Sequence, residues 1–150
     1  MTTFADPIEA DDDINRSFKT AWDTGAKVIA GYAPVVRWQG VVEAVPNPLQ
    51  AWVRVTIAPV MTQQVALADA NGKRRDETSG IVTVQVFTPM SQQDGWLLAK
   101  RLGVLARKPF LRRSLSGKIW FRRARIIPLN PDGEFHRLNV IAEYEYDELN

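Results

Sequence analysis

The side chains best able to do chemistry form a basic, aromatic stretch between residues 100 and 125. This stretch holds ten lysines and arginines and no acidic residue. Phe110, Trp120 and Phe121 lie among them, and basic groups beside aromatic rings suit contact with a nucleic-acid backbone and its bases. The pattern also fits a solvated basic surface above aromatic core residues, and composition alone favours this simpler interpretation. The arginines concerned are Arg112, Arg113, Arg122, Arg123 and Arg125.

An acidic tail follows the basic stretch. Glu143, Glu145 and Asp147 belong to the last ten residues, which contain no basic side chain. Residues 71–150 together carry 14 basic and 9 acidic side chains, whereas residues 1–70 carry 5 and 8. Such asymmetry favours an electrostatically directed contact, in which the acidic residues are the complement of a basic surface.

The strand expected over Ile119–Ile127 has no cleanly apolar face. Because side chains alternate along a strand, Phe121, Arg123 and Arg125 are expected on one face. The other face would carry Trp120, Arg122 and Ala124. An edge position or a subunit interface suits such a strand better than the centre of a core, and this points toward assembly.

The remaining reactive side chains form no recognisable catalytic or metal site. The chain has one histidine, His136, and no cysteine, so a common zinc site would need several carboxylates. Gly72 and Gly80 lack the spacing of a phosphate-binding loop, and Gly117-Lys118 is not followed by serine or threonine. We therefore expect no catalytic residue, no metal and no cofactor, and we predict that the protein is not an enzyme.

A polar excursion of 22 residues separates two strand-like runs near the middle of the chain. The runs, Trp52–Ile57 and Ile81–Phe87, are rich in β-branched residues. Hairpin loops take about 2–5 residues, and loops longer than roughly 12–15 are uncommon unless they bind something or are disordered. Residues 59–80 are therefore predicted to be a long loop or β-arm that contacts a partner. Its candidate contact residues are Gln63, Gln64, Lys73, Arg74 and Arg75.

The surrounding pattern predicts one α+β domain over residues 1–150, with residues 1–10 flexible. The expected elements are a helix from its caps Asp11-Asp12-Asp13 to Gly31, strands at 35–38, 52–57 and 81–87, a helix from its cap Ser91 to Pro109, strands at 119–127 and 135–146, and turns at 46–48 and 128–133. This order gives a largely antiparallel or mixed β-sheet flanked by two main helices.

Composition places the chain among ordinary globular proteins. It has 150 residues, of which 45% are hydrophobic and 24% are charged, enough for one domain with a real core. No apolar stretch approaches the roughly 20 residues that cross a bilayer. The first residues lack the basic and apolar regions of a signal peptide. We expect a soluble intracellular protein with no membrane partner.

The order of several landmarks resembles that of a known family. The landmarks are Trp52-Val53-Arg54-Val55, Gln63-Gln64, a basic arm ending at Thr78-Ser79-Gly80, the strand and proline at 82–89, Gly95 and Ala99, Phe110, Gly117-Lys118-Ile119-Trp120-Phe121-Arg122, and a terminal strand from Leu138-Asn139-Val140 to Tyr146-Asp147-Glu148. Over residues 14–148 this order resembles the bacteriophage tail terminator-like family. The motifs are structural signatures rather than catalytic ones.

The resemblance implies an α+β fold and a role like that of the lambda-type tail terminator or tail completion protein. It implies a homo-oligomeric ring, usually a hexamer, at the end of a phage tail tube. Such a ring stops polymerisation of the major tail tube protein and provides the surface that joins the head completion or connector protein. It would assemble in the host cytoplasm and then belong to the virion tail. Because a tube cap lies on the path of DNA, its basic surface could make passing contact with genomic DNA.

Other function classes stay open at the level of sequence. A head–tail connector or neck protein would share most of these features, and the sequence separates it poorly from a terminator. A small nucleic-acid-binding domain would use the basic segment 107–125. An enzyme acting on a small molecule would need reactive groups that the sequence does not bring together.

Overall fold

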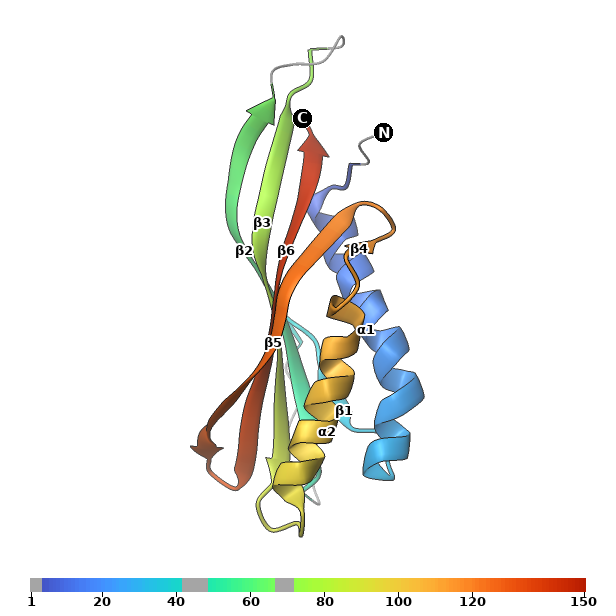
Figure 1. Ribbon diagram of the computed structural model, residues 1–150, viewed down its shortest axis with the longest axis vertical. Helices are drawn as coiled ribbons and strands as arrows, with labels where there is room; N and C mark the ends of the chain where they lie inside the picture. The colour runs from blue at the N-terminus through green and yellow to red at the C-terminus, as the bar shows by residue number, and fades with distance from the viewer. Residues whose placement is uncertain (1–3, 42–48, 67–71) are drawn as a thin grey trace.

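The computed structural model describes residues 4–41, 49–66 and 72–150, and these form one six-stranded sheet with two main helices (Figure 1). In chain order the elements are α1 (Pro7–Ala30), β1 (Val35–Arg37), β2 (Trp52–Ala66), β3 (Arg75–Pro89), α2 (Gly95–Arg107), the 3-10 helix η1 (Lys108–Phe110), β4 (Ser114–Leu115), β5 (Ile119–Asp132) and β6 (Phe135–Leu149). The predicted α+β class is confirmed. The turn predicted at 46–48 lies outside the described residues.

The sheet has the strand order β1-β2-β3-β6-β5-β4. All neighbouring strands are antiparallel except β1 and β2, which are parallel. The central strand β3 pairs with β6 along its whole length and with β2 between Arg75 and Phe87. Both helices pack on the same side of this twisted sheet, so its other face is open (Figure 1).

The core lies between the helices and the sheet. Along β6, Leu138, Val140 and Ala142 are buried and alternate with half-buried residues, as expected for a strand with one covered face. On the opposite side of the core, α1 contributes Ile14, Phe18 and Trp22 at helical spacing. The face of the sheet that carries the alternate residues is therefore the open one.

The first helix begins earlier than the sequence suggested. Its N-cap is Asp6, whose Oδ1 accepts a hydrogen bond from the Glu9 N–H at 2.7 Å, and Pro7 follows directly. The three aspartates predicted as caps, Asp11-Asp12-Asp13, lie inside the helix instead. Residues 7–10 belong to this helix, and the flexibility predicted for residues 1–10 stays a prediction. The predicted end at Gly31 is correct, because this residue caps the helix with φ of 82°.

The second half of the chain differs from expectation at two boundaries. Ser91 is not a helix cap, because α2 starts at Gly95 after Asp94, which has φ of 61° and makes no side-chain cap bond. The predicted turn at 128–133 is largely strand, since β5 runs on to Asp132. Proline is tolerated there because the outer side of β5 has no strand neighbour at Pro128 within the described chain.

Candidate interaction surfaces

The excursion at 59–80 is mostly a continuation of two strands. β2 extends from the predicted end at Ile57 to Ala66, and β3 begins at Arg75 instead of Ile81. Thr62 and Thr78 face each other across the pair, with their hydroxyl oxygens 2.9 Å apart. The segment is therefore a β-arm rather than a loop over these residues, and it rises beyond the helices (Figure 1).

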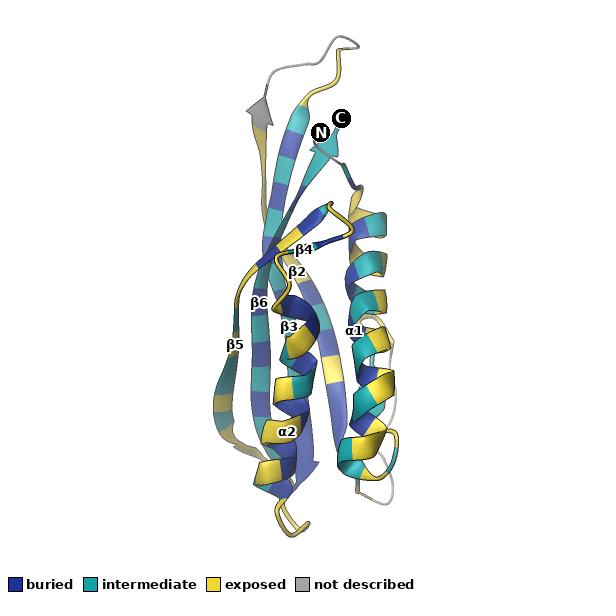
Figure 2. Cartoon of the chain, turned by 45° about the vertical axis from the view of Figure 1, so that its right-hand side comes forward, coloured by how far each residue is buried: buried dark blue, intermediate teal, exposed yellow. Residues whose placement is uncertain are grey.

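The outer strand of this arm is exposed on both faces. All seven residues from 58 to 64 are exposed, and the upper part of β2 is accordingly yellow in Figure 2. Val60 and Met61 are the large apolar side chains there, with 67% and 54% of their surfaces accessible. β1 covers the outer edge of β2 only at Trp52, Val53 and Arg54. In the described part of the chain, no strand therefore pairs with the outer edge of the arm.

The predicted contact residues of the arm divide into two groups. Gln63 and Gln64 are exposed on β2, as a contact role requires, and Lys73 is exposed beside the arm. Arg74 and Arg75 contact carboxylates of their own chain. Arg74 Nε lies 3.1 Å from Asp76 Oδ2, and Arg75 Nε lies 3.3 Å from Asp147 Oδ2. These are their side-chain partners in the isolated subunit.

Asp76 anchors the outer part of the arm, where it lies opposite Gln64. It is 3% exposed, and besides Arg74 it accepts a hydrogen bond from Asn150 Nδ2 at 2.9 Å. The backbone of Asn150 also exchanges hydrogen bonds with that of Arg74, which extends the β3–β6 pairing to the last residue. A buried carboxylate is stable only when its acceptor sites are used, so these bonds tie the arm to the C-terminal strand.

A bulge in β5 changes which face its arginines occupy. Arg123 has a left-handed backbone with φ of 55°, and the register with β6 shifts between Arg122 and Arg125. Before the bulge Phe121 faces the core, and after it Ile126 does, so Arg125 follows Arg122 on the open face. The predicted grouping of Phe121, Arg123 and Arg125 on one face is therefore wrong. Simple alternation could not reveal the inserted residue.

The predicted basic and acidic residues meet on the open face of β5 and β6. Arg122 Nη2 lies 3.0 Å from Glu145 Oε2, and Arg123 Nε lies 3.5 Å from Glu143 Oε2. These pairs are within one chain. A complement between subunits stays a prediction, and any such contact would have to compete with the pairing already present.

The aromatic residues of the basic segment belong mainly to the core. Phe110 and Phe121 are buried and pack edge to face with their centroids 5.4 Å apart, whereas Trp120 is 44% exposed. Arg112 and Arg113 are exposed just before β4. This arrangement agrees with a solvated basic surface above core aromatics, and it leaves one exposed ring for stacking on a base.

A further cluster, which the sequence did not single out, lies on the open face near the start of β2. The rings of Trp52 and Phe87 stack with centroids 3.9 Å apart and an interplanar angle of 4°. The Arg37 guanidinium lies 4.6 Å from the Trp52 centroid, and that of Arg54 lies 5.5 Å from it. Phe135 packs edge-on against both rings. With Arg137, these residues line a cavity of about 440 Å³, which we term the arginine–aromatic groove.

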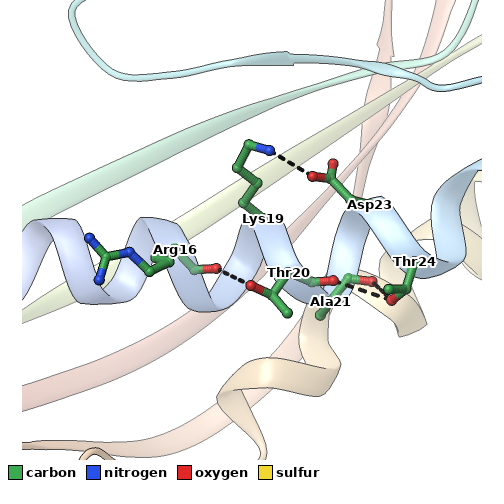
Figure 3. A network of polar contacts seen from close by, with 6 residues as sticks. All are labelled: Arg16, Lys19, Thr20, Ala21, Asp23 and Thr24. Carbon is green, nitrogen blue, oxygen red and sulfur yellow. Dashed lines mark hydrogen bonds and ion pairs between the residues drawn. The ribbon is translucent and has the colours of Figure 1, made fainter.

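A second cleft, of about 610 Å³, separates α1 from η1 and β4. The hydroxyls of Thr20 and Thr24 at this cleft donate to helix carbonyls, that of Thr20 to Arg16 O at 2.9 Å (Figure 3). Lys19 on the same helix pairs with Asp23 at 2.7 Å. The hydroxyl protons of Thr20 and Thr24 are therefore satisfied by carbonyl oxygens of α1.

His136 is packed against an aromatic ring. Its ring centroid lies 5.7 Å from that of Trp96 at an angle of 62°. No group of three or more histidine, cysteine or acidic residues placed to hold a metal occurs among the residues described. The predictions of no enzyme activity and no cofactor are not tested by this observation.

Two tyrosines are the most strongly perturbed titratable groups of the covered face. Tyr144 and Tyr146 are buried on β6, with rings stacked 6.2 Å apart. Burial raises the pKa of both phenols above the ordinary value, because the charged phenolate would lose its hydration. Nearby acidic groups raise both pKa values further, but burial is the largest cause.

Comparisons with known proteins identify the fold but not a family. No family model matches the chain, and no curated protein matches it. One solved structure, which carries no functional name, matches with a TM-score of 0.59 and 20% sequence identity over 90% of this chain and 94% of its own. At that identity the likeness shows the fold alone.

A second solved structure is described as the virion of a native gene transfer agent particle. It matches with a TM-score of 0.44 and 12% identity over 87% of this chain and 91% of its own, a likeness too distant to carry an argument about function. None of the described helices is long and apolar enough to span a membrane. The exposed arm and the other surfaces described above are therefore the basis for a proposal on function.

Proposed function

We propose that this protein is a phage tail-terminator subunit that closes into a ring on the end of a tail tube. The observation that carries the proposal is the projecting part of β2, residues 58–64, which is exposed on both faces and has no described strand paired with its outer edge. A strand edge of this kind has backbone donors and acceptors that another chain can pair.

The composition of this edge suits assembly. Residues 58–64 contain no charged side chain, and Val60 and Met61 are exposed among them. Soluble proteins commonly protect an outer strand with charges or bulges, as β5 does with Arg123 and Arg125 at its bulge. The arm has Pro59 and two register shifts, between Pro59 and Met61 and between Gln64 and Ala66, but no charge along residues 58–64. Covering it by a neighbouring subunit or by a tube end would bury apolar surface and satisfy its backbone.

The two edges of the sheet differ, so contact between them would be heterologous. A head-to-tail contact of this kind generates a ring if the rotation closes. The remaining parts of the proposal come from the sequence resemblance: six subunits, the major tail tube protein and the head connector as partners, assembly in the host cytoplasm, and action without catalysis.

The proposal is tested with two matched substitutions. Val60→Lys places a charge on the open strand edge, whereas Val28→Lys makes the same change at an exposed position on α1. We expect Val60→Lys to abolish the ring in sedimentation measurements and to give tails of abnormal length, and Val28→Lys to leave both unchanged.

A deletion gives a second, independent test. Removal of residues 62–79 takes away most of the arm while leaving the pairing of β2 with β3 around Val55 and Val84. Normal tail length with this deletion would exclude a role of the arm in termination. Equal assembly of the two lysine variants would exclude the strand edge as the contact.

A further inference from the structure

The arginine–aromatic groove has an excess of guanidinium groups without counter-ions. Arg75, Arg122 and Arg123 elsewhere on the sheet each have a carboxylate within 4.0 Å. Within the part of the chain that the structure describes, Arg37 and Arg54 have none. Asp132 and Glu134 line the same cavity but pair with neither of them.

The strand register makes this excess more pronounced. Arg37 on β1 lies directly opposite Arg54 on β2, and like charges in that position repel each other. In the adjacent row Trp52 lies opposite Phe87, which in turn lies opposite Arg137 on β6. Arg137 donates a hydrogen bond from its Nε–H to the carbonyl oxygen of Asn130 at 3.0 Å. The two terminal nitrogens of its guanidinium remain as donors. Three positive groups thus surround one pair of rings.

The rings fix the orientation of two of these groups. A guanidinium held over an aromatic face is oriented by the ring quadrupole, and its N–H donors lie at its edge, where a carboxylate can accept two hydrogen bonds. Two buried donors of the groove have no acceptor among the described residues, Arg37 Nε and Trp52 Nε1. Trp52 is only 4% exposed, so this donor is also shielded from water. Among the described residues, no carboxylate oxygen pairs with these donors, although Asp132 and Glu134 line the same cavity.

We propose that the arginine–aromatic groove binds the carboxylate side chains of an acidic protein segment. The acidic pair at its rim, Asp132 and Glu134, disfavours a continuous polyphosphate but lets a peptide place its carboxylates at the arginines. A volume of about 440 Å³ accommodates a few side chains rather than a duplex. The groove lies at the start of β2, away from the arm, so this inference does not depend on the proposed ring.

The first test measures binding of a capped, labelled hexaglutamate peptide to the full chain by fluorescence anisotropy. Arg54→Gln removes a charged donor and should weaken binding about tenfold, the usual effect of losing one charge-assisted hydrogen bond. Arg101→Gln removes the same charge from an exposed position on α2 and should change the affinity less than about twofold. Equal affinities of the two variants would overturn the proposal.

A second variant keeps the test decisive if Arg54→Gln unfolds. Glu134→Gln removes an exposed negative charge from the rim and should strengthen peptide binding by about twofold or more, because a like charge near the bound carboxylates is gone. Unchanged or weaker binding by this variant would contradict a carboxylate ligand.

A nucleic-acid probe distinguishes a groove that binds carboxylates from one that binds nucleic acid. Short single-stranded DNA is titrated under the same conditions against the unmodified chain and Arg54→Gln. Binding of DNA that depends on Arg54, without binding of hexaglutamate, would overturn the proposal in favour of a nucleic-acid site. Absence of binding by both probes would also overturn it.

Discussion

Replacement of Gly80 by alanine should weaken the base of the β-arm. Gly80 is buried on β3 between Pro59 on β2 and Tyr144 on β6. A Cβ atom built on it would lie 2.6 Å from Tyr144 Oη and 2.7 Å from its Cζ, and closer still to the carbonyl oxygen of Ala58. Real Cβ atoms essentially never show contacts under 3.0 Å. A ladder carbonyl and a buried ring must therefore move.

Overpacking of this kind costs about 1–3 kcal/mol of unfolding free energy, and we expect the upper part of that range because backbone is involved. For a chain of this size that corresponds to a fall in Tm of about 4–12 °C. The assay is urea and thermal unfolding followed by circular dichroism. An intact core with a displaced arm would appear as a separate, earlier transition.

Gly25→Ala is the matched control. There the new Cβ would approach Leu105 Cδ1 to 2.7 Å, but this atom is the end of a flexible side chain. Alanine also favours the helix by up to about 1 kcal/mol relative to glycine. The unfolding free energy should therefore change by less than about 1 kcal/mol. Equal destabilisation by the two substitutions would refute the reasoning.

Three further predictions concern capping, charge pairing and pH. Asp6→Ala should lower the unfolding free energy by about 1 kcal/mol, because the N-cap hydrogen bond is lost. Asp11→Ala should leave the unfolding free energy unchanged. Chemical denaturation of the two variants measures the difference. A double-mutant cycle on Arg122 and Glu145 should give a coupling of about 0.2–1 kcal/mol that disappears in high salt, since this pair is partly exposed; a salt-independent coupling would contradict that. The raised pKa of Tyr144 means that the unfolded chain ionises first above about pH 10, so the unfolding free energy should fall as pH rises beyond that value. Tyr144→Phe should make this fall shallower, and an unchanged slope in pH-dependent unfolding would assign it to other groups.

The order of elements could be predicted from the sequence because the buried strands and helices carry strong periodicity. Val82, Val84 and Val86 alternate with polar residues, and the pattern predicts a strand with one covered face. The sequence left a loop and a β-arm open for residues 59–80, because residues 58–64 are exposed on both faces and have no alternation. Their conformation follows from pairing with β3, which in turn pairs with β6 far along the chain.

The sequence contains a clear signal for the start of α1, at Asp6 and Pro7. Asp6 followed by Pro7 is a typical N-cap and first helical residue, whereas Asp11-Asp12-Asp13 suggested a cap only by charge. Acidic side chains inside the first turns are also favourable, so charge alone does not locate the boundary.

The sequence predicts the exposure of single residues better than it predicts which residues of different strands come together. Gln63 and Gln64 are exposed as expected, since no other strand covers them. The arginine–aromatic groove could not be found, because it joins Arg37, Trp52 and Arg137 from three strands whose register the sequence does not reveal. The bulge at Arg123 similarly depends on one left-handed residue that has no glycine to mark it.

The central claim is that the chain closes into a ring on a tube end through the open edge of its β-arm. Electron microscopy of the purified full chain mixed with its cognate tail tube tests this most directly. We expect a closed ring with rotational symmetry at one end of each tube, and its loss with Val60→Lys but not with Val28→Lys. Tubes with bare ends, or decoration unaffected by Val60→Lys, would contradict it.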